Sequence, residues 1–476
     1  MNKSKPLTKS DFLSYLEAPL HLWAKKHNLI EKSPSVFEIH IMNQGYEVEK
    51  LAKEYIHAVI INHSKDEILH WQKTCSHQNY TIRADALVYK SQTDSYDLYE
   101  IKSGTGVKRE NYYDVAYQYL VLSEEHKIDS LFILHLKKEY VREGQLNIAQ
   151  LFVAEDITQK VFEIIDGVEA NLPMAWETAQ SASMGGIPHC YKPGDCPCPS
   201  LCHPNLPDYS IYDIPYIREN KKIQLLDLGI HDIKDVPADF PLNDKQRLII
   251  EVACSNHEHI DRKAIRREFQ RFVYPLYFLD YETCLTAVPM FDGYHPQQQV
   301  VFQYSLHKME SLDARVTHTE HLSVTKDDPS ISLLQQLRED IGNTGTIFVW
   351  NKSFEMTRHK ELSVIHPKYA NFLLGLNERI YDLADFVKNG LYLHPHFKGS
   401  WSIKNVLPVM VPELSYEDMQ IGAGDQAMTT WWEMVNGNLP TGEIEKTKEA
   451  LLRYCELDTF AMVKIWQKIQ NIILIN

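Results

Sequence analysis

The fold of the second half of this chain is decided by one stretch, Leu276-Tyr277-Phe278-Leu279-Asp280-Tyr281-Glu282-Thr283. Its apolar and aromatic first half predicts a buried β-strand. Because side chains alternate between the two faces of a strand, Asp280 and Glu282 point to one side and Tyr281 to the other. Two carboxylates on so apolar a strand repel each other unless a positive charge lies between them. A divalent metal ion is the simplest source of that charge.

Two downstream segments offer further carboxylates. Residues 348–355 predict a second apolar strand that runs into Asn351 and Glu355, and residues 380–383 contain Asp382. Taken alone, two acids at a spacing of two are more typical of a strand that has reached the surface and faces water. The metal-site interpretation therefore depends on several motifs that follow one another in order.

The last of these motifs is helical. Tyr454 and Asp458 are four positions apart, so they lie one turn apart on the same face of a helix. Together with the two strands, this pattern resembles the DnaQ-like exonucleases of the RNase H-like fold, in their tyrosine-containing (DEDDy) form. Over about residues 271–470 the chain is more closely similar to an uncharacterised bacterial domain found C-terminal to RecB-like nuclease domains. That similarity includes Gly399-Ser400-Trp401-Ser402-Ile403-Lys404 and Ile421-Gly422-Ala423-Gly424.

The resemblance to DnaQ-like exonucleases implies a site for two Mg²⁺ or Mn²⁺ ions and a 3′-to-5′ polarity. The implied metal ligands are four acids: Asp280, Glu282, Glu355 and Asp458. The resemblance also implies that Tyr454 orients the attacking water. The second motif normally carries Asp, so Glu355 is a departure with a longer side chain, and Asp382 is the alternative ligand. Lys404 is either a phosphate contact or a plain surface lysine.

A second group of polar residues lies in the N-terminal third. Residues 82–89 and 96–102 predict two strands that fold back on each other as an antiparallel hairpin. Glu100 and Lys102 then share one face, with Asp85 close by on the neighbouring strand. In such a D…E-x-K arrangement the acids can hold a metal while the lysine orients or activates water. The triplet alone is common, and it equally fits a solvated surface hairpin.

With the helical pattern that follows, this hairpin resembles the PD-(D/E)XK nucleases of the RecB-like and CRISPR-associated exonuclease group. The resemblance covers about residues 7–205. It implies that Gln118, on the helix after the E-x-K strand, belongs to the site. These relatives often complete the metal shell with an upstream His. The corresponding predicted helix, residues 45–59, offers Glu49 instead, or less favourably Glu47.

Four of the eight cysteines are crowded into one short segment: Cys190, Cys196, Cys198 and Cys202. Four thiolates can hold zinc or an iron–sulfur cluster, and this density indicates a metal site in a reducing compartment rather than a disulfide framework. RecB-like relatives often hold a four-iron cluster with three such cysteines, which Cys190, Cys196 and Cys202 match, and one near the N-terminus. Here Ala18 stands at that last position, so either Cys198 substitutes or the cluster is lost.

A chain of 476 residues is too long for one ordinary core. We expect an α/β protein with a PD-(D/E)XK domain over residues 1–205, a helical connector over 206–270 and an RNase H-like domain over 271–476. The formal net charge is −15, so any surface that binds phosphates must be local. We see no secretory signal and no apolar stretch near the ~20 residues of a membrane span, and we expect a cytoplasmic protein without a membrane partner.

These observations predict a metal-dependent nuclease. We expect DNA as the substrate, attacked at ends or as single strands, in repair or in defence against foreign DNA. Two alternatives remain open. One is a nucleic-acid-binding scaffold in which the nuclease sites are degenerate, and the other is an RNA-processing exonuclease, because the DnaQ-like fold also serves RNA.

Overall fold

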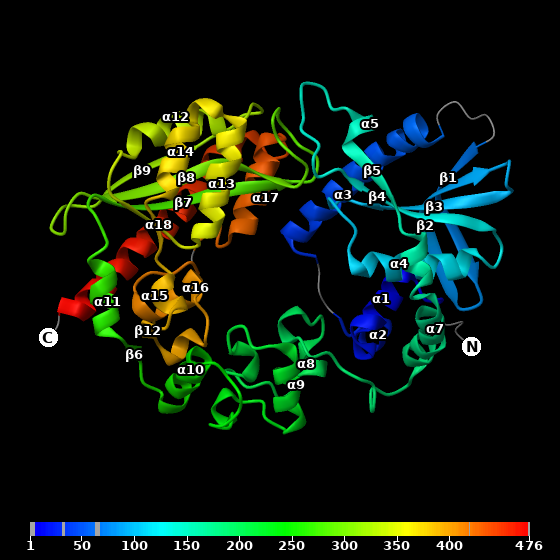
Figure 1. The fold of residues 1–476 in the computed structure, drawn as a ribbon, viewed down its shortest axis with the longest axis horizontal. Helices are drawn as coiled ribbons and strands as arrows, with labels where there is room; N and C mark the ends of the chain where they lie inside the picture. The colour runs from blue at the N-terminus through cyan, green and yellow to red at the C-terminus, as the bar shows by residue number, and fades with distance from the viewer. Residues whose placement is uncertain (1–4, 31–33, 62–66, 418, 475–476) are drawn as a thin grey trace. The chain divides into compact units, whose positions relative to one another are not determined.

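The computed structural model describes residues 5–30, 34–61, 67–417 and 419–474. The chain forms two compact units (Figure 1). The first unit comprises residues 1–204 with 286–298, and the second comprises 205–285 with 299–476. Each unit is mixed α/β and is built on a five-stranded sheet. No helix in the described ranges is both long and apolar enough to cross a membrane.

The sheet of the first unit has its strands in sequence order. They are β1 (Glu67–His77), β2 (Tyr80–Lys90), β3 (Ser95–Lys102), β4 (Ile128–Leu136) and β5 (Phe152–Asp156). The expected hairpin is confirmed, because β2 and β3 pair antiparallel with Ala86 opposite Tyr99. Strands β3 and β4 run parallel, and α4 (Arg109–Leu122) makes the crossover that a parallel pair needs. Strand β1 was not predicted.

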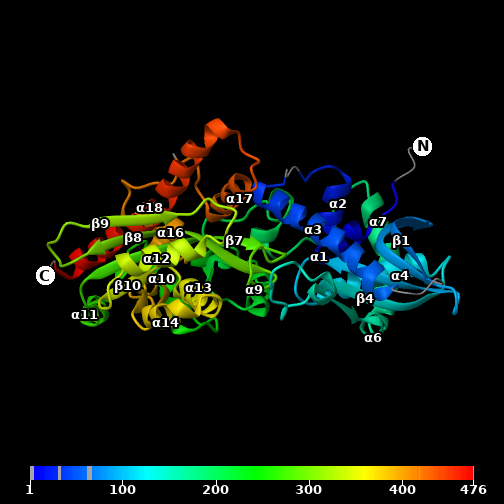
Figure 2. The ribbon, with the colours of Figure 1, turned by 90° about the horizontal axis from the view of Figure 1, so that it is seen from above.

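Helices cover both faces of this sheet. The helices of this unit are α1 (Lys9–Glu17), α2 (Pro19–Lys26), α3 (Val36–Tyr55), α4, α5 (Ile148–Leu151), α6 (Thr158–Phe162), α7 (Ile165–Gln180) and α8 (Pro199–Cys202). Side chains of α1, α4 and α7 share one core with Ala84 and Leu98. On the other face, α3 packs on Ala86 and Tyr99 (Figure 2). Asp85 lies between Ala84 and Ala86 on β2. Because each of these alanines is buried in one of the two cores, the strand that carries Asp85 is well packed.

The helix expected over residues 45–59 begins earlier than predicted. In the structure α3 starts at Val36, because Ser35 caps it by accepting a hydrogen bond from the Glu38 backbone while the Glu38 side chain accepts one from Ser35. A π-helical turn, Ile56–Ile60, follows its end. Glu49 consequently lies well inside the helix, on its second turn from the C-terminal end.

The sheet of the second unit has the order β11-β10-β7-β8-β9. Its strands are β7 (Leu276–Thr286), β8 (Gln298–Met309), β9 (Thr317–Leu322), β10 (Thr346–Val349) and β11 (Ile380–Asp382). The quoted stretch thus forms the central strand, β7, as predicted. Strand β10 runs parallel to both β7 and β11, and β8 and β9 pair antiparallel.

The second predicted strand was too long. Strand β10 ends at Val349 and α13 (Lys352–Ile365) begins three residues later, so Glu355 lies on the first turn of a helix. The Lys352 backbone amide donates to Asp382 Oδ2 at 3.2 Å. Asp382, at the end of β11, therefore satisfies one of the open amides at the start of α13.

Two groups of helices enclose the second sheet. The helices are α9 (Glu219–Asp227), α10 (Asp244–Ser255), α11 (Arg262–Phe269), α12 (Ser330–Asp340), α13, α14 (Ala370–Asn377), α15 (Asp385–Lys388), α16 (Ile403–Met410), α17 (Gly424–Val435) and α18 (Ile444–Leu474). Helix α18 packs against the face that carries Leu276 and Phe278. Helices α12, α13 and α14 pack against the face that carries Tyr277 and Leu279.

The segment 206–270, expected as a separate connector, belongs to the second unit. Its apolar residues, among them Leu225, Ile249 and Ile265, share one core with Leu276 of β7. The residue pair His259–Ile260 (β6) also pairs with Tyr392–Leu393 (β12). The connector is therefore part of the second unit's fold and not a linker between folds.

Candidate functional site

One cleft in the second unit collects the acids that the sequence singled out. It has a volume of about 220 Å³, and we call it the C-terminal acidic cleft. It is lined by Asp280, Tyr281, Glu282, Trp350, Asn351, Phe354, Glu355, Ile403, Tyr454, Asp458 and Met462. The expected residues of strand β7, helix α13 and helix α18 thus meet at one place, although they are far apart in the chain.

Local structure explains this convergence. Residues two apart on β7 share a face, so Asp280 and Glu282 lie on the side of the sheet that also carries Phe278. Helix α18 crosses that side. Tyr454 and Asp458, one helical turn apart, are both nearly buried there, with 5% and 9% of their surfaces exposed. The alternation on β7 and the helical spacing on α18 therefore correctly predicted that these four residues lie together.

The acids of the cleft lie close together. One carboxylate oxygen each of Asp280 and Glu282 and the Cys455 sulfur lie within 4.8 Å of one another. Cys455 Sγ is 3.8 Å from Asp280 Oδ2. The Tyr416 hydroxyl donates to Asp458 Oδ1 at 2.6 Å. Oxygen ligands at this density suit a hard divalent cation such as Mg²⁺ or Mn²⁺.

Burial and mutual repulsion raise the pKa values of the acids in this cleft. Burial, and then repulsion from Asp458, Glu282 and Glu355, raise the pKa of Asp280 well above its usual range. Burial and the neighbouring Asp458 likewise raise the pKa of Glu282. Burial raises the pKa of Asp458 to about 6, even though hydrogen bonds from Tyr416 and Tyr454 favour its ionised form. A bound cation would relieve this repulsion.

Glu355 is a better candidate than Asp382 for the metal-binding acid of the second motif. Glu355 is only 2% exposed and lines the cleft, and its Oε2 has no hydrogen-bond partner among the described residues. Burial raises its pKa to about 8. The carboxylate of Asp382 instead accepts from the amides of Lys352 and Ala384 and from Lys388 Nζ. Its oxygens are already used to hold the start of α13.

Lys404 is exposed and lies at the rim of the same site. Its Nζ donates to the Gly422 carbonyl at 3.0 Å. Its positive charge lowers the pKa values of Glu282 and Asp458, against the larger opposing effect of burial. This ammonium group therefore acts electrostatically on these two acids.

The first unit also brings its expected residues together. Glu100 and Lys102 share one face of β3, and Lys102 Nζ lies 2.7 Å from Glu100 Oε1. Gln118 Nε2, from α4, donates to Glu100 Oε2 at 2.7 Å. Asp85 Oδ2 accepts from the Ile101 amide at 2.9 Å. We call this group, with the two residues described next, the N-terminal carboxylate network.

Two members of that network were not predicted. Asp114, one turn before Gln118 on α4, accepts from Lys102 Nζ at 2.7 Å and from Gln118 Nε2 at 2.9 Å. Lys9, the first residue of α1, reaches Glu100 Oε1 at 2.5 Å. Burial opposes ionisation of Glu100, but Lys9 and Lys102 outweigh it and hold its pKa below its usual range. Two ammonium groups thus occupy the place where a cation would balance this acid.

Glu49 is near Asp85 but separated from it by one side chain. Gln72 Nε2 donates to Glu49 Oε1 at 2.5 Å and approaches Asp85 Oδ1 at 3.4 Å. Burial, and then the charge of Glu100, raise the pKa of Asp85 to about 7. Glu49, Asp85 and Glu100 therefore form a row of acids, of which Glu100 is neutralised by lysines and Asp85 is not.

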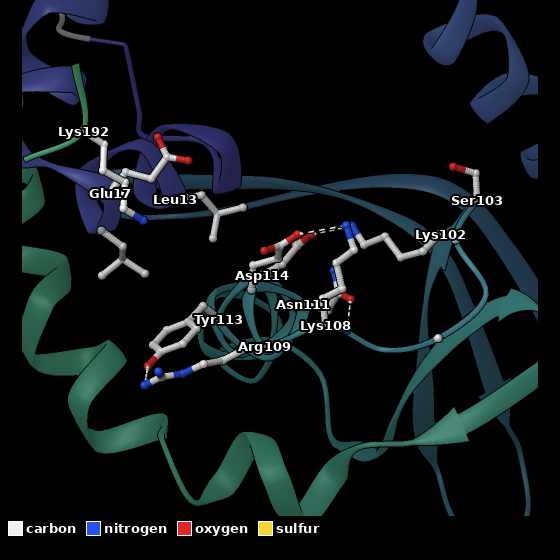
Figure 3. Close-up of a pocket in the computed structure, with 14 residues that line it drawn as sticks. Leu13, Glu17, Lys102, Ser103, Lys108, Arg109, Asn111, Tyr113, Asp114 and Lys192 are labelled. Atoms are coloured by element: carbon white, nitrogen blue, oxygen red, sulfur yellow. Dashed lines mark hydrogen bonds and ion pairs between the residues drawn. The ribbon is translucent and has the colours of Figure 1, made fainter. Parts of the chain in front are cut away.

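A large cleft of about 940 Å³ borders this network (Figure 3). Its positive residues are Lys102, Lys108, Arg109 and Lys192, and its loop residues include Ser103, Gly104 and Gly106. Lys102 and Asp114 face each other on its wall, and Arg109 lies beside Tyr113. We call it the N-terminal cleft. A small-residue loop and several cations make a surface on which a phosphate backbone can lie.

The four clustered cysteines lie close to two histidines, His21 and His203. Cys198 Sγ and Cys202 Sγ are 3.8 Å apart, and Cys196 Sγ is 3.4 Å from the imidazole of His21. Cys190 Sγ is 3.2 Å from His203 Nε2. Histidine ligands were not predicted here. All eight cysteines are free of disulfide bonds.

The sequence contains a signal for only one of the site residues that we did not predict. Asp114 had a signal, because its spacing of four from Gln118 places both on the same face of α4. Lys9, Tyr416 and His21 had none, since each reaches its partner only through packing between distant elements.

Comparison with known proteins gives partial matches. Residues 277–402 match a family described as "Domain of unknown function (DUF2779)". "Uncharacterized protein MG366" of Mycoplasma genitalium is 26% identical over 213 residues, which are 41% of this chain and 32% of that protein. "Uncharacterized protein UU173" of Ureaplasma parvum is 26% identical over 215 residues, 41% of this chain and 31% of its own length. The chain thus spans about a third of these relatives. No solved structure gives a significant match.

Proposed function

We propose that this protein is a metal-dependent nuclease whose C-terminal acidic cleft hydrolyses phosphodiester bonds. The observation that carries the proposal is the meeting of Asp280, Glu282, Glu355 and Asp458 in one cleft, where burial raises their pKa values. Perturbed carboxylates in a cleft are typical of functional sites. The central position of β7, with α18 across the face that carries the acids, supports an RNase H-like architecture for the second unit.

The four acids of the cleft would hold Mg²⁺ or Mn²⁺. Bound there, such ions would supply positive charge that stabilises the oxygens on which negative charge develops during phosphodiester hydrolysis. Tyr454 hydrogen-bonds Asp458 and lines the cleft, so its hydroxyl can orient the attacking water. Trp350 and Phe354 line the same cleft and offer aromatic faces on which a terminal base can stack. Lys404 would contact a neighbouring phosphate.

DNA is the proposed substrate, attacked at ends or as single strands. The negatively charged protein needs a local basic surface for this, and the N-terminal cleft supplies Lys108, Arg109 and Lys192. We propose DNA repair or defence against foreign DNA as the biological setting. This part of the proposal is based only on the resemblance to RecB-like nucleases. None of the described residues is identified as a group that would recognise the 2′-hydroxyl of RNA. The assay therefore needs matched DNA and RNA strands.

The first unit has two candidate roles. It is either a second metal-dependent centre, with Glu49, Asp85 and Glu100 as ligands and Lys102 beside the water, or a nucleic-acid-binding unit with a degenerate PD-(D/E)XK site. The contact of Lys9 with Glu100 favours the second role, because two lysines already neutralise that acid. In that case hydrolysis belongs to the C-terminal acidic cleft and the first unit holds the strand.

The test is degradation of 5′- and 3′-labelled single strands of DNA and of RNA in Mg²⁺ by the full chain. We expect Asp280→Ala to reduce the rate at least about a thousandfold, as removal of a metal ligand does to a step that needs the metal. The exposed Asp313→Ala is the matched control and should leave the rate unchanged. Asp85→Ala separates the two roles of the first unit: cleavage that persists in Asp280→Ala and is lost when Asp85→Ala is added indicates a second centre. Unchanged degradation by the Asp280→Ala, Asp85→Ala double variant would refute the nuclease proposal.

A further inference from the structure

One histidine reaches the cysteine loop from a distant helix. His21, on α2, is 4% exposed, and its Nε2 is 3.4 Å from Cys196 Sγ. Cys198 Sγ and Cys202 Sγ are 3.8 Å apart. One ligand atom from each of these four residues lies within 4.8 Å of the other three. Three sulfurs and one imidazole nitrogen therefore point to a common centre.

The two measured separations agree with a tetrahedral zinc site. Zinc binds thiolate sulfur at about 2.3 Å and imidazole nitrogen at about 2.0 Å. For tetrahedral angles, these bond lengths place two sulfurs about 3.8 Å apart and a sulfur and a nitrogen about 3.5 Å apart. The Cys198–Cys202 and Cys196–His21 separations match both values.

We propose that His21, Cys196, Cys198 and Cys202 bind one zinc ion that joins α2 to the loop of residues 190–203. Four protein ligands leave no open position for a substrate, so the role is structural. The surroundings fit this role, because Ala18, Leu20 and Trp23 pack around the cysteines in a small apolar cluster of their own. The proposal does not depend on the nuclease function.

A second contact supports His21 as a ligand. Histidines that bind metals usually donate their other ring nitrogen to a carboxylate or carbonyl, which fixes the ring. His21 Nδ1 lies 3.5 Å from Glu17 Oε2, close enough for an ion-pair contact, although it makes no hydrogen bond among the described residues. This contact leaves Nε2 as the nitrogen that faces Cys196.

The same geometry argues against the iron–sulfur cluster that the resemblance to RecB-like nucleases suggests. A four-iron cluster takes four cysteine ligands, one for each iron, and these relatives place one of them near the N-terminus. Here Ala18 stands at that position and offers no ligand atom. Cys190, one of the three expected cluster ligands, lies 3.2 Å from His203 Nε2, and these two residues form a second group with Cys196 whose ligand atoms lie within 4.8 Å of one another. The 3.8 Å between Cys198 Sγ and Cys202 Sγ is the separation of two ligands on one ion, so these residues fit a single zinc ion better than a cluster that takes one cysteine for each iron.

The proposed ion also has a structural consequence for the N-terminal cleft. Lys192 lies in the loop between Cys190 and Cys196, and it lines that cleft together with Glu17, whose carboxylate faces His21. Figure 3 shows both residues on the same rim. An ion that holds α2 to this loop would therefore also fix the position of a lysine on the proposed phosphate-binding surface. If the nuclease proposal fails, the zinc site is unaffected.

The test is the metal content of the purified full chain, expressed with both zinc and iron in the medium. We expect one zinc per chain, no iron and no acid-labile sulfide. Replacement by Co²⁺ should give the ligand-field bands of a tetrahedral ion and a thiolate charge-transfer band. His21→Ala and Cys198→Ser should lose the ion, whereas Cys190→Ser, the matched control, should keep it.

If His21→Ala fails to fold, a second substitution at the same position still tests the proposal. His21→Cys restores a four-ligand set and should bind one zinc, with the Co²⁺ spectrum shifted toward that of a four-thiolate site. Iron and sulfide that are lost in Cys190→Ser but kept in His21→Ala would overturn the proposal. So would two zinc ions per chain, undiminished zinc in His21→Ala, or absence of metal from the wild-type chain.

Discussion

The hydroxyl of Tyr416 donates a hydrogen bond of 2.6 Å to Oδ1 of Asp458. Asp458 also accepts a hydrogen bond from Tyr454, one turn earlier on α18. Both bonds favour the ionised carboxylate, whereas burial disfavours it and raises its pKa to about 6. The two tyrosines therefore keep a nearly buried acid available as a metal ligand close to neutral pH.

Replacement of Tyr416 by Phe tests this relationship. Without the hydroxyl, the pKa of Asp458 should rise further, and Mn²⁺ affinity at pH 7 should fall about tenfold, as is usual when a metal ligand loses its supporting hydrogen bond. Calorimetric titration with Mn²⁺ measures the effect. Tyr216→Phe is the control, because Tyr216 is 79% exposed. Equal affinities for Tyr416→Phe and wild type would show that Asp458 does not ligate the ion.

Stability without divalent metal should fall as the pH rises from about 5 to about 8. The folded-state pKa values of Asp458, Asp85 and Glu355 are about 6, about 7 and about 8. All lie above those of unfolded carboxyls, near 4, so in this window the folded chain binds more protons than the unfolded chain. The free energy of unfolding must then decrease with pH. Thermal melts at each pH, with and without Mg²⁺, measure it.

Mg²⁺ should stabilise the protein more at pH 8 than at pH 5, because protons compete with the metal for the same oxygens. A melting temperature that rises between pH 5 and pH 8 in the absence of Mg²⁺ would contradict the pKa shifts. A Mg²⁺ effect of equal size at both values would mean that the ion binds elsewhere.

Glu355→Gln should have opposite effects on stability and on metal binding. At pH 8 the variant removes a buried charge that has no hydrogen-bond partner on Oε2 among the described residues, so without metal it should be more stable by about 2–4 kcal/mol. At pH 5 the wild-type side chain is protonated and the difference should disappear. The exposed Glu378→Gln is the control. Destabilisation at pH 8 would show that Glu355 is held by partners other than a cation.

Much of the fold and part of the site could be predicted from the sequence. The alternation on β7 and the i, i+4 spacing on α18 are local properties, and they placed Asp280, Glu282, Tyr454 and Asp458 correctly. The end of β10 was wrong, because the start of α13 depends on Asp382, which belongs to another strand. Lys9 could not be predicted, since its contact with Glu100 joins residues 91 positions apart through helix packing.

Lys9→Met should destabilise the first unit. The substitution leaves Glu100, 1% exposed, with a single lysine, and the loss of a partner from a buried charge network costs about 2–4 kcal/mol. Calorimetric unfolding should show a lower melting temperature, while Lys5→Met, at an exposed position, should match wild type. If Mg²⁺ restores the stability of Lys9→Met, the N-terminal carboxylate network can take a metal in place of the lysine. If Mg²⁺ has no effect, the network is structural.

The account depends on divalent cations in the C-terminal acidic cleft, and anomalous diffraction from crystals soaked in Mn²⁺ locates such ions directly. We predict a peak within coordination distance of Asp280, Glu282 and Asp458, and its loss in crystals of Asp280→Asn. Crystals that show Mn²⁺ elsewhere in the protein but none between these three carboxylates would contradict the account.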